Sequence, residues 1–295
     1  KQKTAYEIRP RDWSSDVCSS DLDDPFGRLD EARRVHPWLA KTSFGYMITE
    51  YKAVRELILH EDRLRMALTE IADLMGARGT PWGRFIADNI ESQTGETHRR
   101  LRNAVAASFT PGKLKIHRPM IRETITRLLD EWAPRGAFDF EEFVSYFPIS
   151  VMCNLLGAST DVIPRLRSSL EALGLAFGMD RSLLPLLDES VLILDDFVRE
   201  LVAARRAAPA SGGPPDLLDD LLAATASGQM DDEELYSLLV FLFGAGYDTS
   251  KNVLTMTMKI LVQRPDIYER CAADPAFCRK VMNEALRYQI GRAHV

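Results

Sequence analysis

The run DDEELYSLLVFLFGAGYDTSKNVLTMTMKILVQRP, residues 231–265, decides the fold of this chain. It opens on acidic residues, which favour a helix N-terminus, and it closes at Arg264-Pro265, where a helix stops. The run therefore predicts one helix from Asp231 to Gln263. At a rise of about 1.5 Å per residue, this helix would be close to 50 Å long and could cross a whole domain. Helical patterns dominate the rest of the chain, so we predict a mainly α fold.

The middle of this helix departs from ordinary core composition. In FGAGYDTS, residues 243–250, Gly246 weakens a helix, and Asp248 is costly to bury without a partner. A small residue permits close approach by a flat or bulky group, and the hydroxyl of Thr249 can bond to a carbonyl one turn earlier. The stretch predicts a widened groove in which an acid and a hydroxyl relay protons to a bound reacting group. The alternative is a packing glycine, with Asp248 paired to a basic side chain.

The complete pattern is a small residue, glycine, any residue, an acid, threonine and a second hydroxyl residue. Average residue usage produces it by chance in roughly one chain of this length in several hundred. In this pattern the helix resembles the long central helix of the cytochrome P450 haem-thiolate monooxygenases. The resemblance implies a haem (heme) cofactor lying against Ala245 and Gly246, and it implies that Asp248 and Thr249 deliver protons during oxygen activation.

A second motif is GETHRRLRNAVAASFTPGKL, residues 95–114. His98 and Arg102 are four residues apart, so they share one helix face and could hold a pair of carboxylates. From spacing alone, a solvated basic face that includes Arg99 and Arg100 is the alternative. The run resembles the family's helix that holds the haem propionates, which implies that His98 and Arg102 bind them.

A third motif is VMNEALRY, residues 281–288, in which Glu284 and Arg287 are three residues apart and can pair along a helix. The same spacing occurs elsewhere in the chain and indicates little alone. Placed after the long helix, it resembles the family's structural glutamate–arginine pair. We take it as support for the fold, with no catalytic role.

The N-terminal third contains the one predicted strand pair. Residues 25–37 indicate a short amphipathic helix, residues 38–50 a small β-hairpin with a Thr-Ser turn, and residues 51–62 a helix. Residues 63–93 show no clear period and are predicted to form a long irregular loop. Trp82 and Phe85 in that loop, with residues 170–179, would shape a substrate pocket. Core packing is an equally good account of each of these bulky side chains.

Composition excludes several classes of protein. Of 295 residues, 46% are apolar and 27% charged, and the formal net charge of −6 offers no electrostatic footprint for nucleic acid. The longest apolar run, residues 238–247, is too short to cross a bilayer. Four scattered cysteines form no CxxC pair, which indicates free thiols in a reducing cytoplasm, without a disulfide framework or structural zinc.

Both ends of the sequence look foreign. Residues 1–22 and 290–295 resemble translated sequencing-adapter sequence, and a natural disordered tail is the alternative for the first segment. We expect a partial cytochrome P450 domain at residues 23–289. In the family the haem iron takes a cysteine thiolate from a loop resembling Phe-x-x-Gly-x-x-x-Cys-x-Gly. This sequence lacks that loop, so we expect a C-terminally truncated fold, no axial cysteine and an inactive fragment.

For the complete parent protein, the resemblance implies a bacterial monooxygenase that inserts one oxygen atom from O₂ into a C–H bond of a small hydrophobic organic substrate. It implies a ferredoxin-type or similar electron donor, and no nucleic-acid or membrane partner. Two alternatives stay open. One is the same fold using peroxide or performing a rearrangement. The other is a non-enzymatic all-α ligand-binding or scaffold protein, which would explain the missing cysteine but would leave three ordered motifs as coincidence.

Overall fold

The computed structural model describes residues 25–42, 45–60, 63–208 and 216–289. Internal contacts divide the chain into two units, and the boundary in the sequence lies between Arg65 and Met66. The first unit holds α1 (Pro25–Val35), β1 (Leu39–Thr42), β2 (Gly45–Ile48) and α2 (Tyr51–Leu57). The second holds α3 (Leu68–Met75), α4 (Pro81–Asp88), α5 (Gly95–Ala106), α6 (Pro111–Trp132), α7 (Phe140–Leu156), α8 (Ile163–Leu175), α9 (Leu184–Ala207), α10 (Leu217–Ala226), α11 (Asp232–Val262), α12 (Pro265–Ala273) and α13 (Pro275–Gln289).

The first unit has the predicted order of helix, hairpin and helix. Strands β1 and β2 pair antiparallel, with Leu39 opposite Ile48. The predicted turn is Thr42-Ser43; Thr42 is the last residue of β1, and Ser43 lies outside the described part of the chain. The Nε of Arg33 on α1 donates to the backbone carbonyl of Thr49 at 2.8 Å, which ties that helix to the end of the hairpin. The hairpin prediction is confirmed.

The long helix is α11, and its ends explain its length. The side chain of Asp231 accepts from the backbone N–H of Glu234, whose carboxylate accepts in turn from the backbone N–H of Asp231. This reciprocal capping box satisfies donors that the first turn leaves free. The helix closes at its C-cap Gln263, two residues before Pro265. The predicted helix from Asp231 to Gln263 is therefore confirmed.

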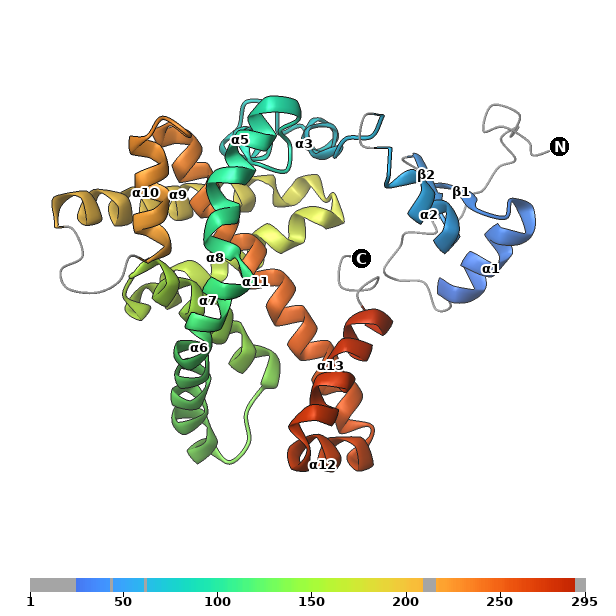
Figure 1. Ribbon diagram of the computed structural model, residues 1–295. Coiled ribbons are helices and arrows are strands. Elements are labelled where there is room, and N and C mark those ends of the chain that lie inside the picture. Colours follow the sequence, from blue (N-terminus) through green and yellow to red (C-terminus); the bar gives the residue numbers. More distant parts are fainter. Residues whose placement is uncertain (1–24, 43–44, 61–62, 209–215, 290–295) are drawn as a thin grey trace. The chain divides into compact units, whose positions relative to one another are not determined.

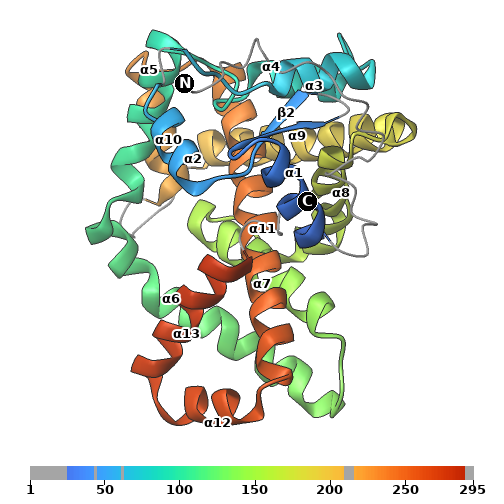
Figure 2. The same cartoon turned by 90° about the vertical axis from the view of Figure 1, so that its right-hand side faces the viewer.

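Helix α11 is the axis on which the second unit packs. Figures 1 and 2 show it running through that unit, where it contacts α7, α8, α9 and α13. Its apolar face enters the main core, where α7–α10 meet it, through four side chains that are almost completely buried: Leu235, Leu239, Phe243 and Tyr247. Burying such side chains is the main stabilising contribution in a helical domain. The middle of α11 is thus held rigidly in place.

The predicted irregular loop at residues 63–93 is wrong, because the structure contains α3 and α4 there. Helix α3 ends on Gly76, which takes the left-handed conformation at φ 75°. Helix α4 begins after Thr80, whose hydroxyl accepts from the backbone N–H of Gly83, and Pro81 occupies its first turn. These are ordinary stop and start signals. Each helix has only eight residues, so its apolar period is too short to recognise by itself.

The end of α3 and the first turn of α4 lie unusually close together. A Cβ atom built on Gly83 would lie 1.8 Å from the backbone carbonyl oxygen of Ala77. Only a residue without a side chain lets the first turn of α4 lie against the end of α3 in this way. The contact sets the angle at which α4 presents Trp82 and Phe85.

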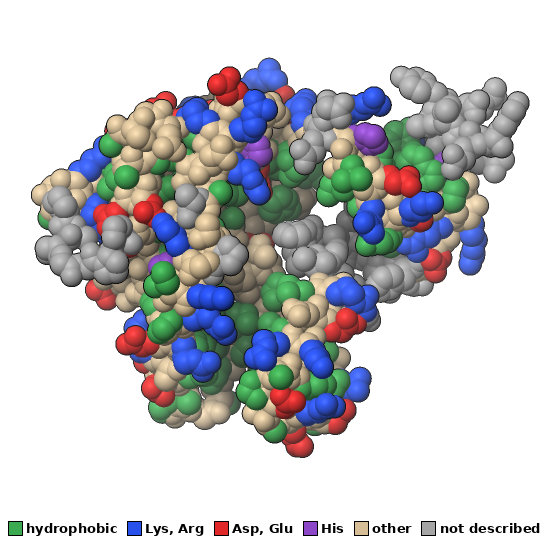
Figure 3. Space-filling view, in the orientation of Figure 1, with side chains coloured by type: hydrophobic (Ala, Val, Ile, Leu, Met, Phe, Trp, Pro, Cys, Tyr) green, Lys and Arg blue, Asp and Glu red, His purple; other side chains and the backbone are tan. Residues whose placement is uncertain are grey.

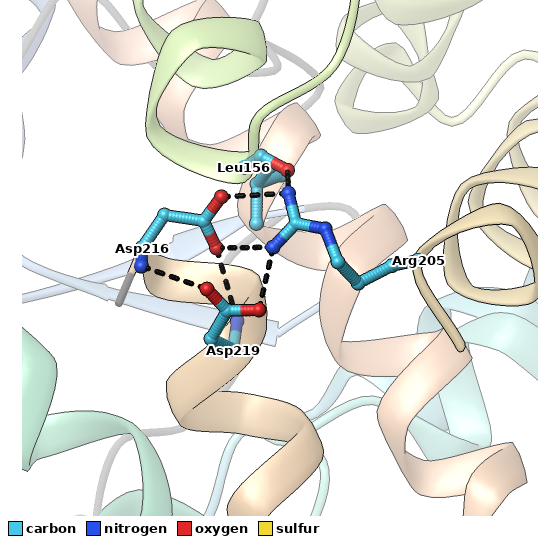
Figure 4. Close-up of polar contacts among 4 residues, drawn as sticks. All are labelled: Leu156, Arg205, Asp216 and Asp219. Atoms are coloured by element: carbon cyan, nitrogen blue, oxygen red, sulfur yellow. Dashed lines mark hydrogen bonds and ion pairs between the residues drawn. The ribbon is translucent and has the colours of Figure 1, made fainter. Parts of the chain in front are cut away.

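An arginine clasp joins three helices at the far end of α9 (Figure 4). Arg205 donates from Nη1 to Asp216 at 2.8 Å and to Asp219 at 2.7 Å, and from Nη2 to Asp216 at 2.7 Å and to the Leu156 carbonyl at 3.2 Å. Asp216 and Asp219 also cap α10 reciprocally. We call these groups the Arg205 clasp. It links the last turns of α9 and α7 to the first turn of α10.

The surface carries charges of both signs. Figure 3 shows acidic and basic side chains interspersed over the face that it draws. Among the described residues, every helix is too short or too polar to span a bilayer.

Candidate active site

A cavity of about 200 Å³ lies between α3, α4, α8 and α11. Its wall is mostly apolar, with bulky side chains from all four helices and from the 3-10 turn that follows α8: Leu68, Ile71, Trp82, Phe85, Ile86, Leu170, Leu173, Phe177 and Phe241. Trp82, Phe85 and residues of the segment at 170–179 thus line one cavity, Trp82 also packs in a core cluster, and the substrate role stays a prediction. Concave sites with an apolar lining and a few polar groups are the usual form of small-molecule sites.

Helix α11 supplies the polar part of this wall. Ala245, Asp248 and Thr249 line the cavity, as the sequence predicted for the groove. Within the described residues, the Thr249 hydroxyl has no hydrogen-bond partner, so the suggested bond to an earlier carbonyl is not made. Thr257, which is buried farther along the helix, does make such a bond, to the Val253 carbonyl at 2.7 Å. The difference arises because Thr249 faces open space.

The Asp248 carboxylate is also free of basic partners in the part of the chain that the structure describes. Lys251, one turn further along α11, pairs with Glu141 at 2.9 Å instead. A Cβ built on Gly174 of α8 would lie 3.1 Å from Asp248 Oδ1, so this glycine leaves room for the carboxylate beside α8. The alternative of a structurally paired aspartate is therefore not what the structure contains.

A partly buried polar contact joins α8 to α11 next to this acid. The Tyr247 hydroxyl donates to Glu171 Oε1 at 3.0 Å, and Arg167 Nε donates to the same oxygen at 3.2 Å. Burial and the neighbouring Glu171 carboxylate raise the pKa of Tyr247, so the phenol stays a neutral donor. The position of Asp248 relative to α8 is thereby set by its sequence neighbour.

The two glycines of the motif lie on different faces of α11. Gly244 lines the cavity with Asp248, one turn away, whereas a Cβ on Gly246 would lie 3.3 Å from the Met152 sulfur of α7. The sequence analysis selected Gly246 and missed Gly244. Helical spacing alone could have found it, because residues four apart share a face and residues two apart do not. The assignment of Gly246 to cofactor binding stays a prediction.

His98 and Arg102 lie on α5, which is anchored in the core by Leu101 and Ala104. His98 is half-buried and Arg102 exposed, and neither side chain has a partner among the described residues. Arg100, between them in the sequence, behaves differently, since it forms a bidentate pair with Glu234 of α11. On this basic face, Arg100 is therefore a structural arginine, whereas His98 and Arg102 are free donors. Both are outside the cavity wall, and their propionate role stays a prediction.

The cysteines do not complete the site. Cys153 is buried in α7, and burial raises the pKa of its thiol to about 12, which keeps it protonated. Cys271 and Cys278 are half-buried on α12 and α13, and Cys18 lies outside the described residues. None of the three described cysteines lines the cavity. Within the same ranges no cluster of side chains could hold a metal ion. For haem, the described residues thus offer the free donors of α5 and the small-residue face of α11, without a thiolate.

The predicted glutamate–arginine pair forms on α13. Arg287 Nε donates to Glu284 Oε2 at 2.9 Å, and a second hydrogen bond joins Nη2 to Oε1. Both side chains are exposed, while Ala285 between them is buried. The pairing is confirmed, and the structural role stays a prediction.

The motifs and their geometry agree with the comparisons. The family model described as Cytochrome P450 matches residues 166–275, which include the cavity-lining parts of α8 and α11. The chain is 30% identical over 260 residues to the luteothin monooxygenase of Streptomyces thioluteus, covering 86% of this chain and 62% of that protein. The chain belongs to the cytochrome P450 family. The biotin biosynthesis cytochrome P450 of Bacillus subtilis (strain 168) is 25% identical over 291 residues, 94% of this chain and 70% of that one.

Solved cytochrome P450 structures share the fold. The structure of P450BioI in complex with hexadec-9Z-enoic acid ligated acyl carrier protein gives a TM-score of 0.75 at 23% identity, covering 92% of this chain and 70% of that one. Epothilone B-bound cytochrome P450epoK gives 0.76 at 22% identity, over 90% and 68%. The predicted family and mainly helical fold are confirmed. Among the curated relatives named above, the chain spans 62% and 70% of their length.

Proposed function

We propose that this cytochrome P450 chain holds the substrate pocket and proton-delivery groups of a haem-dependent monooxygenase acting on small hydrophobic organic molecules. The observation that carries the proposal is the side-by-side placement of Asp248 and Thr249, both without partners, in the wall of an otherwise apolar cavity. Asp248 is half-buried and Thr249 is exposed, so both side chains can contact a molecule bound in the cavity and exchange protons with solvent. The luteothin monooxygenase relative supports the reaction class.

Haem, when bound, supplies the activation of O₂ that an apolar cavity cannot provide. Within the proposal, His98 and Arg102 donate to its propionates, and Ala245 and Gly246 keep the nearby helix face small. The electrons come from a ferredoxin-type or similar donor in the cytoplasm.

The remaining chemistry belongs to this chain's own side chains. The apolar wall binds the substrate and keeps bulk water away from it, so that protons reach the substrate site only through Asp248 and Thr249. Asp248 is half-buried and can exchange its proton with solvent, while the neighbouring Thr249 hydroxyl can accept that proton and pass its own into the cavity. Gly174 leaves the carboxylate room to turn between these two positions.

Two other functions make different demands on the same residues. Peroxide-driven or rearrangement chemistry in the same fold needs no proton relay, so an unpaired acid and hydroxyl would have no purpose there. A non-enzymatic ligand-binding protein would use the apolar cavity alone, and the unpaired Asp248 carboxylate would then have no role in it. We therefore favour monooxygenation.

Replacing Thr249 tests the proposal. In the complete, haem-loaded protein, we expect Thr249→Ala to keep consuming electrons while product per electron falls at least about tenfold, because a positioned proton-transfer group contributes about 10²- to 10⁴-fold to a rate. Thr249→Ser keeps the hydroxyl and should restore most of the coupling. The measurement is the ratio of product formed to reductant oxidised. Unchanged coupling in Thr249→Ala would contradict the proposal and support the peroxide or rearrangement alternative.

A further inference from the structure

One buried amide in the cavity wall leaves half of its hydrogen-bonding capacity unused. Asn89 forms the C-cap of α4, and only 3% of its surface is exposed, yet it lines the cavity together with the bulky residues. A buried amide normally uses both its oxygen and its nitrogen, because an unmade hydrogen bond is costly there. Asn89 uses only the oxygen.

The orientation of this amide follows from its neighbours. Asn89 Oδ1 accepts from the backbone N–H of Glu91 at 2.9 Å and from that of Ser92 at 3.2 Å. Two donors on one atom identify that atom as the oxygen and make a flipped amide untenable. The Nδ2 group, with two hydrogens, has no partner in the described residues. The chain therefore holds a fixed hydrogen-bond donor at the α4 side of the cavity.

The charges of the wall restrict what this donor can meet. Glu91 and Asp248 line the cavity, and the lining that the structure describes contains no lysine, arginine or histidine. The Asp248 carboxylate, with no basic side chain in this lining to offset it, disfavours an anionic ligand. A fatty-acid carboxylate would face repulsion here, whereas a neutral carbonyl or ether oxygen would not.

We propose that Asn89 is a specificity-determining residue whose Nδ2 donates to a carbonyl or ether oxygen of a neutral, ring-bearing apolar substrate. Aromatic and branched apolar side chains cover the rings, Asn89 fixes the oxygen, and Asp248 with Thr249 lies on the α11 side of the same cavity. The inference rests on the proposed function, because it takes this cavity to be the substrate site. It adds the chemical class of the substrate and the residue that orients it.

Three probes of one shape test the inference without turnover. Benzophenone carries a neutral carbonyl between two rings, diphenylmethane lacks the oxygen, and 4-benzoylbenzoate adds a carboxylate. Equilibrium dialysis against the 295-residue chain gives a Kd for each. We expect benzophenone to bind about 3- to 10-fold more tightly than diphenylmethane, the scale of one neutral hydrogen bond. The benzoate should bind at least about tenfold more weakly than benzophenone. Equal binding of the two neutral probes, or no binding of either, would overturn the proposal.

The variant Asn89→Asp removes the donor while keeping an oxygen for the two backbone N–H groups. It should erase the preference for benzophenone over diphenylmethane and leave the Kd of diphenylmethane within about twofold. Asn283→Asp, which adds the same charge on exposed α13, is the matched control and should preserve the preference. A preference retained in Asn89→Asp would overturn the assignment to Asn89. If Asn89→Asp does not fold, the comparison of probes on the unchanged chain still tests whether the cavity prefers a neutral carbonyl.

The result separates this inference from the proposed function. If the carbonyl preference is found but Thr249→Ala leaves coupling unchanged, the monooxygenase proposal fails and the binding inference stands. If Thr249→Ala uncouples the enzyme but both neutral probes bind equally, the substrate-class inference fails alone.

Discussion

The Arg205 clasp and the wall of the cavity both contain partly buried carboxylates, but these carboxylates have opposite surroundings in the two places. In the clasp, the Arg205 side chain is 9% exposed and makes four hydrogen bonds, and each carboxylate also caps a helix. In the wall, Asp248, Thr249 and the amide nitrogen of Asn89 have no partners within the described ranges. The paired charges of the clasp hold helices together, whereas the unpaired polar groups of the wall are free to bind a molecule from outside the chain.

The largest expected effect comes from breaking the clasp. Arg205→Ala leaves two neighbouring carboxylates and the Leu156 carbonyl without their donor, so we expect the free energy of unfolding to fall by about 2 to 3 kcal/mol. Urea denaturation measures it. Arg165→Ala removes an exposed pair with Glu200 and serves as the control, with an expected loss below about 1 kcal/mol. Equal losses in the two variants would show that the clasp is not the special contact that its geometry suggests.

The second prediction concerns acid. Burial by itself raises the pKa of the Asp216 carboxyl, but Arg205 and the backbone N–H groups of Asp219 and Leu218 together outweigh it and hold the pKa below its ordinary value. A carboxyl with a lower pKa in the folded chain contributes stability above its unfolded pKa, near 4, and loses it as the pH falls through the folded pKa.

Unfolding midpoints in urea between pH 7 and pH 3 test this linkage. The wild-type chain should lose more stability on acidification than Arg205→Ala, so the difference between them should shrink below about pH 4. A difference that stays constant over this range would show that Arg205 does not act through the Asp216 carboxylate.

The smallest expected effect is in the cavity wall. Asp248→Asn removes a charge that has no partner, so we expect the free energy of unfolding to stay within about 0.5 kcal/mol of the wild type or to rise slightly. The same urea titration measures it. A loss above about 1 kcal/mol would mean that Asp248 has a structural partner, and the contrast between the clasp and the wall would then fail.

The sequence predicted those parts whose signals are local. The acids at 231–234 and Pro265 bound α11 because capping and chain breaking act within one turn. The groove at Ala245, Asp248 and Thr249 was predictable because helix geometry fixes which neighbours share a face. The Glu284–Arg287 pair follows from spacing in the same way.

Features that depend on distant segments were missed. Helices α3 and α4 are stabilised by packing on α9 and its neighbours, and a two-turn apolar pattern does not reveal that. Asn89 looks like an ordinary surface residue in the sequence. Its burial needs the cavity, and its orientation needs the backbone turn at Glu91 and Ser92. The role of Gly174, which leaves room for the Asp248 carboxylate, likewise becomes visible only when α8 is packed against α11.

The close turn at Gly83 has a consequence for how this pocket can change through natural variation. Any side chain at position 83 would enter the Ala77 carbonyl, whereas a methyl group at Gly244 would meet only Leu173, at 4.0 Å. On the α11 wall, a substitution that adds a methyl group, such as Gly244→Ala, can therefore reduce the cavity volume without disturbing the backbone. The α4 wall must keep its backbone path and can change only through the side chains that it carries, Trp82, Phe85 and Asn89 among them.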